Sequence, residues 1–176
     1  MNEKFNIEIK AKCNFHNDVR NILESENAIY IGTDNQIDTY FKVTSGRLKL
    51  REGNIENALI HYNREDKADP KASDVLLYKS ESTGLLKELL EKALGVLAVV
   101  DKKREIYFIG NAKIHLDIVK DLGEYIEIEI QGNPHDDKSE LLNKCKYLLK
   151  LFGIKDENLI SYSYSDLVLG NDSFLN

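Results

Sequence analysis

Asn6-Ile7-Glu8-Ile9-Lys10-Ala11-Lys12 is the stretch that decides the fold of this chain. Apolar and polar residues alternate along it, so the aliphatic side chains point to one face and the charged ones to the other, as in a strand. The charged face of a single strand of this kind could simply be exposed to solvent. The same design returns in residues 46–51 and 125–131, where charges again alternate with leucine or isoleucine. Several strands of this kind predict a sheet that gathers its polar face in one place.

Composition bounds the class of protein. With 176 residues and 42% hydrophobic content the chain can bury one good core, and we predict a single domain over 1–176. Its apolar runs are far shorter than the roughly 20 residues of a membrane span, and no secretion signal precedes them. We therefore expect a cytoplasmic protein without a membrane partner. The two cysteines, Cys13 and Cys145, lack the spacing of a zinc site, and we interpret both as reduced bystanders. The net charge of −6 argues against nucleic acid as a partner.

The remaining periodicities predict an antiparallel α+β protein. Helical spacing predicts amphipathic helices at 16–26, 83–94 and 138–152, with one or two short helical turns near the C-terminus. Asp34-Asn35 is interpreted as a turn, and residues 65–73, which include Pro70, as a loop. Short connections favour antiparallel pairing. Strands are expected at residues 5–12, 28–33, 36–41, 46–51, 57–64, 74–80, 95–109, 112–119 and 125–131.

Closing these strands into a barrel is the most complete way to protect their edges. The aliphatic face must meet the three helices, so the charged face is left to line the interior. A closed barrel with a charged lumen is a tunnel. Charges held in a confined, low-dielectric space are costly unless a ligand or counter-ion balances them. The pattern therefore predicts a ligand inside the barrel.

Two sets of charges are expected to face the lumen. Converging arginines and lysines suit phosphate oxygens, and several carboxylates suit a hard cation such as Mg²⁺ or Mn²⁺. Together they describe a polyphosphate bound with its metal, while the alternative is cross-strand salt bridging without a ligand. The chain has no P-loop, GxGxxG or HExxH motif. The basic set is Lys10, Lys12, Arg47, Lys49, Arg51, Arg64, Lys102 and Arg104, and the acidic set is Glu8, Asp117, Glu127 and Glu129.

Five blocks of the chain resemble, in order, the motifs of the CYTH family, the triphosphate tunnel metalloenzymes that include class IV adenylyl cyclases and thiamine triphosphatases. The resemblance covers about residues 5–131 and leaves a C-terminal helical part of about 136–176. Asn6–Lys10 is similar to the ExExK opening, residues 36–41 and 46–52 to the second block, Tyr62-Asn63-Arg64 to the next basic strand, Lys102-Lys103-Arg104 to the KxR pair, and residues 117–129 to the closing DxVxxLGxFxEIE segment.

The resemblance implies a closed eight-stranded antiparallel tunnel in which the basic set holds a triphosphate and the acidic set holds Mg²⁺ or Mn²⁺. Lys10 and Arg104 are then the expected catalytic residues. The first glutamate of ExExK is Asn6 here, which ligates a cation without bringing charge, and position 63, where some members place lysine, is Asn63. These departures put the metal affinity and one phosphate contact in question.

The resemblance leaves the reaction open. Attack by the ribose 3′-hydroxyl on the α-phosphorus of ATP gives cyclic AMP and pyrophosphate, which is the activity we favour. Attack by water on the terminal phosphorus gives an organic or inorganic triphosphatase. A third alternative is a non-catalytic polyphosphate- or nucleotide-binding module. A homodimer is compatible with the sequence. His61 and His115 are interpreted as hydrogen-bonded in place.

Overall fold

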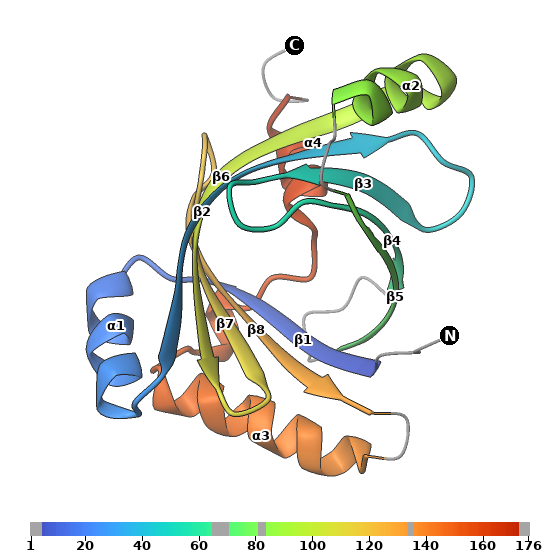
Figure 1. Ribbon diagram of the computed structural model, residues 1–176. Helices are drawn as coiled ribbons and strands as arrows, with labels where there is room; N and C mark the ends of the chain where they lie inside the picture. Colours follow the sequence, from blue (N-terminus) through green and yellow to red (C-terminus); the bar gives the residue numbers. More distant parts are fainter. Residues whose placement is uncertain (1–4, 65–70, 81–83, 134–135, 173–176) are drawn as a thin grey trace.

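The described part of the chain forms a closed barrel of eight antiparallel strands (Figure 1). The computed structural model describes residues 5–64, 71–80, 84–133 and 136–172. Around the ring the strands follow the order β1-β5-β4-β3-β2-β6-β7-β8, and pairing of β1 with β8 closes it. The predicted closed antiparallel barrel is confirmed. Its strands are β1 (Phe5–Lys12), β2 (Ile29–Phe41), β3 (Arg47–Glu52), β4 (Ala58–Arg64), β5 (Lys71–Lys79), β6 (Val96–Ile109), β7 (Ala112–Val119) and β8 (Gly123–Gly132).

In the ranges that the structure describes, four α-helices and a short 3₁₀ turn accompany the barrel. They are α1 (His16–Ser25), α2 (Gly84–Leu94), α3 (Lys138–Leu151), η1 (Asp156–Asn158) and α4 (Tyr164–Asp172). The three amphipathic helices therefore begin and end within two residues of their expected bounds. Among the described residues, no helix combines the length and the apolar character that crossing a membrane would need.

The main core lies outside the barrel, between the outer faces of β1, β7 and β8 and the two helices α1 and α3 (Figure 1). Alternation along β8 turns Ile126, Ile128 and Ile130 outward into this core, where each is almost fully buried. Both free cysteines, Cys13 and Cys145, are packed there as well. Because the aliphatic faces of these strands point to the helices, the charged faces point into the barrel.

The helix α2 does not take part in this core. None of its residues is buried, and Leu85 and Leu89 are 77% and 59% exposed. It lies on the other side of the barrel from α1 and α3, where it approaches β2 and its Lys87 pairs with Glu52 of β3 (Figure 1). The prediction that all three helices cover the aliphatic face is wrong for α2, because α1 and α3 already cover the most apolar strands.

The strand β2 is longer than the sequence suggests. Residues 28–33 and 36–41 were separated by an expected turn at Asp34-Asn35, yet pairing with β6 runs through both residues. The carboxylate of Asp34 is fully buried and accepts hydrogen bonds from the backbone N–H groups of Ile55 and Glu56, at 2.9 and 3.0 Å. Asp34 is therefore an anchor for a neighbouring turn. Of the loop expected at 65–73, residues 65–70 lie outside the described residues, and β5 already begins at Lys71.

Candidate active site

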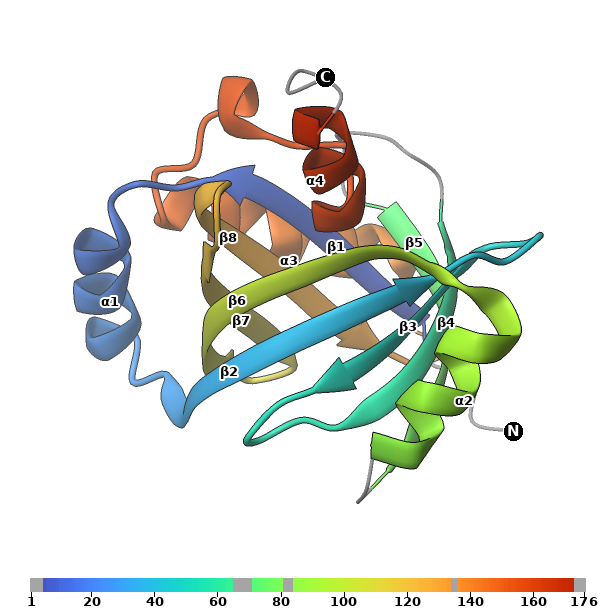
Figure 2. The same cartoon turned by 90° about the horizontal axis from the view of Figure 1, so that it is seen from above.

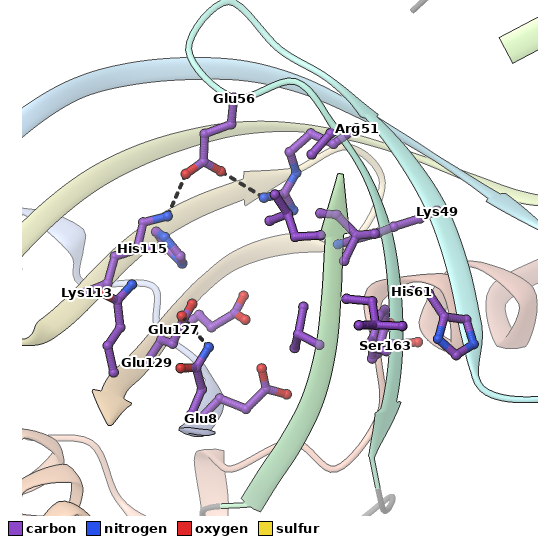
Figure 3. Close-up of a pocket in the computed structure, with 18 of the residues that line it drawn as sticks. Glu8, Lys49, Arg51, Glu56, His61, Lys113, His115, Glu127, Glu129 and Ser163 are labelled. Atoms are coloured by element: carbon purple, nitrogen blue, oxygen red, sulfur yellow. Dashed lines mark hydrogen bonds and ion pairs between the residues drawn. The ribbon is translucent and has the colours of Figure 1, made fainter. Parts of the chain in front are cut away.

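A cavity of about 1700 Å³ occupies the barrel and is lined by residues of all eight strands. In the close-up of Figure 3, basic and acidic side chains face one another across this space. The structure brings together most of the charged residues that the sequence selected. Those that line the cavity are Glu8, Lys10, Lys49, Arg51, Lys102, Arg104, Glu127 and Glu129.

Four of the selected residues lie elsewhere or are not described. Lys12 is exposed and stands outside the cavity lining. Arg47 is also outside it and donates from NH2 to Oδ2 of Asp166 in α4, at 3.0 Å. Asp117 is fully buried behind the lining. The side chain of Arg64 lies outside the described residues, although its backbone ends β4.

Asp38, on β2, gathers three of the cations. Its Oδ2 accepts hydrogen bonds from Nζ of Lys49 at 2.9 Å and from Nζ of Lys102 at 2.7 Å. Its Oδ1 accepts from Nε of Arg51, also at 2.9 Å. Burial by itself would raise the pKa of Asp38, but the three cations hold that pKa well below its usual value. Asp38 received no role from the sequence, although alternation with Gln36 and Tyr40 could have placed it on the inward face.

Arg104 is held by two carboxylates. Its Nε and NH2 donate to the two oxygens of Asp117, both at 2.6 Å, and NH2 also donates to Oε2 of Glu127 at 2.8 Å. The hydroxyl of Tyr164 donates to Oδ2 of Asp117 at 2.8 Å. Both oxygens of Asp117 are thus engaged within the protein. Its geometry is that of a residue that orients Arg104, and it does not match the metal ligand expected from the sequence.

The C-terminal segment supplies one wall of the site. Tyr164, the first residue of α4, lines the cavity and is nearly fully buried. Its ring centroid is 3.9 Å from Nζ of Lys10 and 5.1 Å from the ring of Tyr125. Figure 2, seen from above, shows α4 lying over the barrel near β6. The sequence indicated only short helical turns here and did not assign Tyr164 to the site.

The acidic side of the cavity is built by β1 and β8, whose register sets Glu8 opposite Glu129 and Lys10 opposite Glu127. Nδ2 of Asn6 donates to Oε1 of Glu129 at 2.8 Å, while the buried Oδ1 of Asn6 has no hydrogen-bond partner. Burial raises the pKa of Glu129, and the neighbouring Glu127 and Glu8 raise it further, whereas Lys113 lowers it. This corner therefore gathers three carboxylates and an amide oxygen, with Arg104 bound to Glu127 and Lys113 facing Glu129 on the neighbouring strand.

Such a donor set fits a hard divalent cation, because carboxylate and amide oxygens are the ligands that Mg²⁺ and Mn²⁺ take. Glu8, Glu127, Glu129 and the unpartnered oxygen of Asn6 are the residues that would hold it. Within the described ranges, no three acidic, histidine or cysteine side chains are already arranged as a metal site. The carboxylates would therefore draw together around the ion.

His115, on β7, departs from its expected role. Its side chain lines the cavity, and both ring nitrogens are buried without a hydrogen-bond partner. Burial, together with Arg104 and Lys113, lowers the pKa of His115 well below its usual value, so the imidazole is neutral. A neutral imidazole offers one donor and one acceptor to a ligand. His61, in contrast, is hydrogen-bonded as expected, with Nε2 at 3.1 Å from the carbonyl oxygen of Ser45.

Known proteins share this architecture. A protein of Methanocaldococcus jannaschii, named "putative adenylate cyclase", is 27% identical over 92% of this chain and 97% of its own length. A solved structure from Pyrococcus horikoshii has a TM-score of 0.81 at 25% identity, over 92% of this chain and 98% of its own. A solved structure of a "putative adenylate cyclase" from Vibrio parahaemolyticus has a TM-score of 0.75 at 20% identity, over 93% of this chain and 97% of its own, and shows the fold alone.

The family model of the CYTH domain matches residues 4–164. A charged tunnel of this topology and a match over nearly the whole chain lead to one conclusion: the chain belongs to the CYTH family.

Proposed function

We propose that this protein is a metal-dependent enzyme that binds ATP in its tunnel and converts it into cyclic AMP and pyrophosphate. CYTH tunnel enzymes bind triphosphates and depend on metal in general. The observation that carries the proposal is the separation of charge inside one cavity, with cations gathered around Asp38 and Arg104 and carboxylates gathered on β1 and β8.

The triphosphate end of the ligand is assigned to the basic side. Lys49, Lys102 and Arg51 are already clustered by Asp38, so a polyanion meets them without first ordering three flexible side chains. Arg104 is likewise fixed by Asp117 and presents a planar group suited to phosphate oxygens. Preorganised cations of this kind stabilise charge that develops on the departing oxygens.

The metal is assigned to Glu8, Glu127, Glu129 and Asn6. When bound there, a divalent cation supplies positive charge to the phosphate oxygens. The protein's own part is to orient these donors. Asn6 contributes through its hydrogen bond to Glu129, which fixes that carboxylate and leaves the amide oxygen facing no partner. An amide in place of a carboxylate lowers the total negative charge of the donor set, so we expect a weaker metal site than one with four carboxylates.

The nucleoside end is assigned to the rest of the cavity. Its volume of about 1700 Å³ exceeds the roughly 300–1,000 Å³ of ordinary ligand pockets, so a triphosphate alone does not fill it. Tyr40, Tyr62 and Ile60 give part of the lining an apolar and aromatic surface. This surface favours a nucleoside triphosphate over inorganic tripolyphosphate.

The same volume favours a second candidate, hydrolysis of the triphosphate. Cyclisation requires the ribose hydroxyl to reach the α-phosphorus in line while water is excluded, whereas hydrolysis requires only a water at the terminal phosphorus. A roomy cavity admits that water. The name of the relative from Methanocaldococcus jannaschii favours cyclisation, and the volume of the cavity favours hydrolysis.

Incubation of the protein with α-labelled ATP and Mn²⁺, followed by chromatography, distinguishes the candidates. Labelled cyclic AMP with pyrophosphate supports the cyclase. Labelled ADP with free phosphate would show that the protein is a triphosphatase. Its rates with thiamine triphosphate and tripolyphosphate would then identify the substrate. Binding of these compounds by calorimetry without any product would identify a binding module. Absence of binding would overturn the proposal as a whole.

A further inference from the structure

Glu56 places a carboxylate inside the cavity, among the cations expected to bind phosphate. It comes from the turn between β3 and β4 and lines the cavity. Its Oε2 accepts from NH1 of Arg51 at 2.9 Å, and its Oε1 accepts from Nζ of Lys113 at 2.5 Å (Figure 3). Arg51 is thus shared between Asp38 and Glu56. A continuous row of alternating charges runs from Lys102 through Asp38, Arg51 and Glu56 to Lys113.

This carboxylate is held in place by the barrel wall. The turn that carries Glu56 is tied to β2 because Asp34 accepts the backbone N–H groups of Ile55 and Glu56. Gln36, also on β2, donates from Nε2 both to Asp34 at 2.7 Å and to Glu56 at 3.2 Å. At Gly53 an added Cβ would stand 2.5 and 2.7 Å from the oxygens of Asp34, so the turn packs tightly against its anchor. Glu56 therefore does not swing aside freely.

Glu56 also remains charged. Burial alone would raise its pKa, but Arg51 and Lys113 outweigh burial and lower the pKa of Glu56 to about 2. An incoming phosphate group and this carboxylate compete for the same two donors, Arg51 and Lys113. Two anions at one position repel each other strongly in a confined space of low dielectric. Asp38, in contrast, is fully buried and does not line the cavity, so it orders its three cations without standing in the path of a bound phosphate.

We propose that Glu56 determines the length of the polyphosphate chain that the tunnel accepts. It interrupts the basic row between Arg51 and Lys113 as a built-in anion, so a chain of three phosphoryl groups that extends from the nucleoside end as far as Arg51 stays clear of Glu56, and a fourth is rejected by charge. The inference rests on the proposed binding of a triphosphate. It assigns Glu56 as a specificity-determining residue that contacts the distal end of the ligand.

The test compares ATP with adenosine 5′-tetraphosphate as ligands of the whole chain, by calorimetry in EDTA. The wild-type protein should bind ATP at least about tenfold more tightly than the tetraphosphate, a difference of about 1.4 kcal/mol. Glu56→Gln keeps the shape and removes the charge, and should bring the two affinities within about twofold, chiefly by strengthening binding of the tetraphosphate.

A matched control removes a carboxylate from the same hairpin but outside the cavity. Glu52 pairs with Lys87 at 2.7 Å and does not line the cavity, so Glu52→Gln should keep the wild-type preference. Glu56→Ala provides a second variant if the glutamine variant fails to fold, and the same loss of preference is expected from it.

The outcomes separate the two proposals. If Glu56→Gln bound both ligands more tightly by the same factor, Glu56 would be a general counter-ion, and the proposal that it sets the length of the polyphosphate chain would be wrong. An unchanged preference between the two ligands would overturn the proposal as well. If the wild-type protein binds neither compound, the proposed function fails first.

Discussion

Asp117 holds Arg104 through two parallel hydrogen bonds of 2.6 Å, one to each carboxylate oxygen, between residues that are directly paired on β7 and β6. Asp117 is fully buried and Arg104 is 3% exposed, so water cannot replace either partner. The pair fixes the plane of the guanidinium, and this plane decides which direction its remaining N–H groups face. Stability and ligand binding are therefore linked at this position.

Replacing Asp117 with Asn should destabilise the protein by about 1.5–3 kcal/mol, because it weakens two charged hydrogen bonds to a buried guanidinium and leaves Glu127 as its one carboxylate partner. Urea unfolding followed by circular dichroism measures this loss. The control is Glu105→Gln, which breaks the partly exposed pair of Arg20 and Glu105, spaced at 2.8 Å, and should cost about 1 kcal/mol or less. Equal losses in the two variants would show that burial does not set the strength of the Arg104 pair.

Replacing Glu129 with Gln should abolish metal-dependent turnover and leave binding of tripolyphosphate in EDTA unweakened. The change removes a ligand charge for the cation and also relieves a carboxylate whose pKa is already raised by burial and by its acidic neighbours. Turnover is followed at increasing Mn²⁺, and binding by calorimetry. A loss of tripolyphosphate affinity in EDTA would contradict the assignment of the acidic corner to the metal.

Affinity for triphosphate should fall as pH rises from about 7 to 9, by up to tenfold per pH unit. Burial, with Arg51 and Arg104 nearby, lowers the pKa of Lys102 to about 7, although Asp38 acts in the opposite direction. Above this pKa the ligand-free protein loses the Lys102 proton, while the bound anion favours the ammonium form. Binding must then take up a proton.

Calorimetry in two buffers of different ionisation enthalpy measures the proton uptake. The variant Lys102→Arg stays protonated throughout this range and should show a flatter pH profile. A wild-type profile as flat as that of the variant would mean that Lys102 is already charged in the empty tunnel.

Truncating Leu89 of α2 to Ala should change the free energy of unfolding by no more than about 0.5 kcal/mol, because its side chain is 59% exposed. The matched change Leu148→Ala in α3 should cost about 2–5 kcal/mol, because that side chain is 2% exposed and packs in the main core. Urea unfolding of both variants tests the contrast. A large loss from Leu89→Ala would show that α2 is covered in solution by a surface absent from the single chain.

Most of the fold could be predicted from the alternation of apolar and charged residues along single strands. A period of two in residues 5–12 and 125–131 places Ile9 and Ile128 outward and Lys10 and Glu127 inward, and the structure has this arrangement. The closed ring followed because so many strands of one design need their edges paired. The cavity lining could therefore be predicted as two sets of charge without knowledge of any contact.

Partnerships between distant residues could not be predicted in this way. That Asp38 binds Lys102, or that Asp117 binds Arg104 and Tyr164, depends on which strands become neighbours and in what register. Asp117 was expected at the metal for this reason, since its inward direction could be inferred and its partners could not. The stripe of leucines in α2 likewise indicates a helix correctly and gives no information on what lies beside it.

The pairing of β1 with β8 also bears on how the protein is made. Asn6 and Glu129, which meet across this seam, are 123 positions apart in the chain. During synthesis β1 emerges early, and one of its edges stays unpaired until β8 has left the ribosome. Contacts of such long sequence separation slow folding, and an open strand edge is a template for association with other chains. A nascent chain is thus most exposed to misassembly before β1 and β8 have paired, and we expect it to depend most on chaperones during that interval.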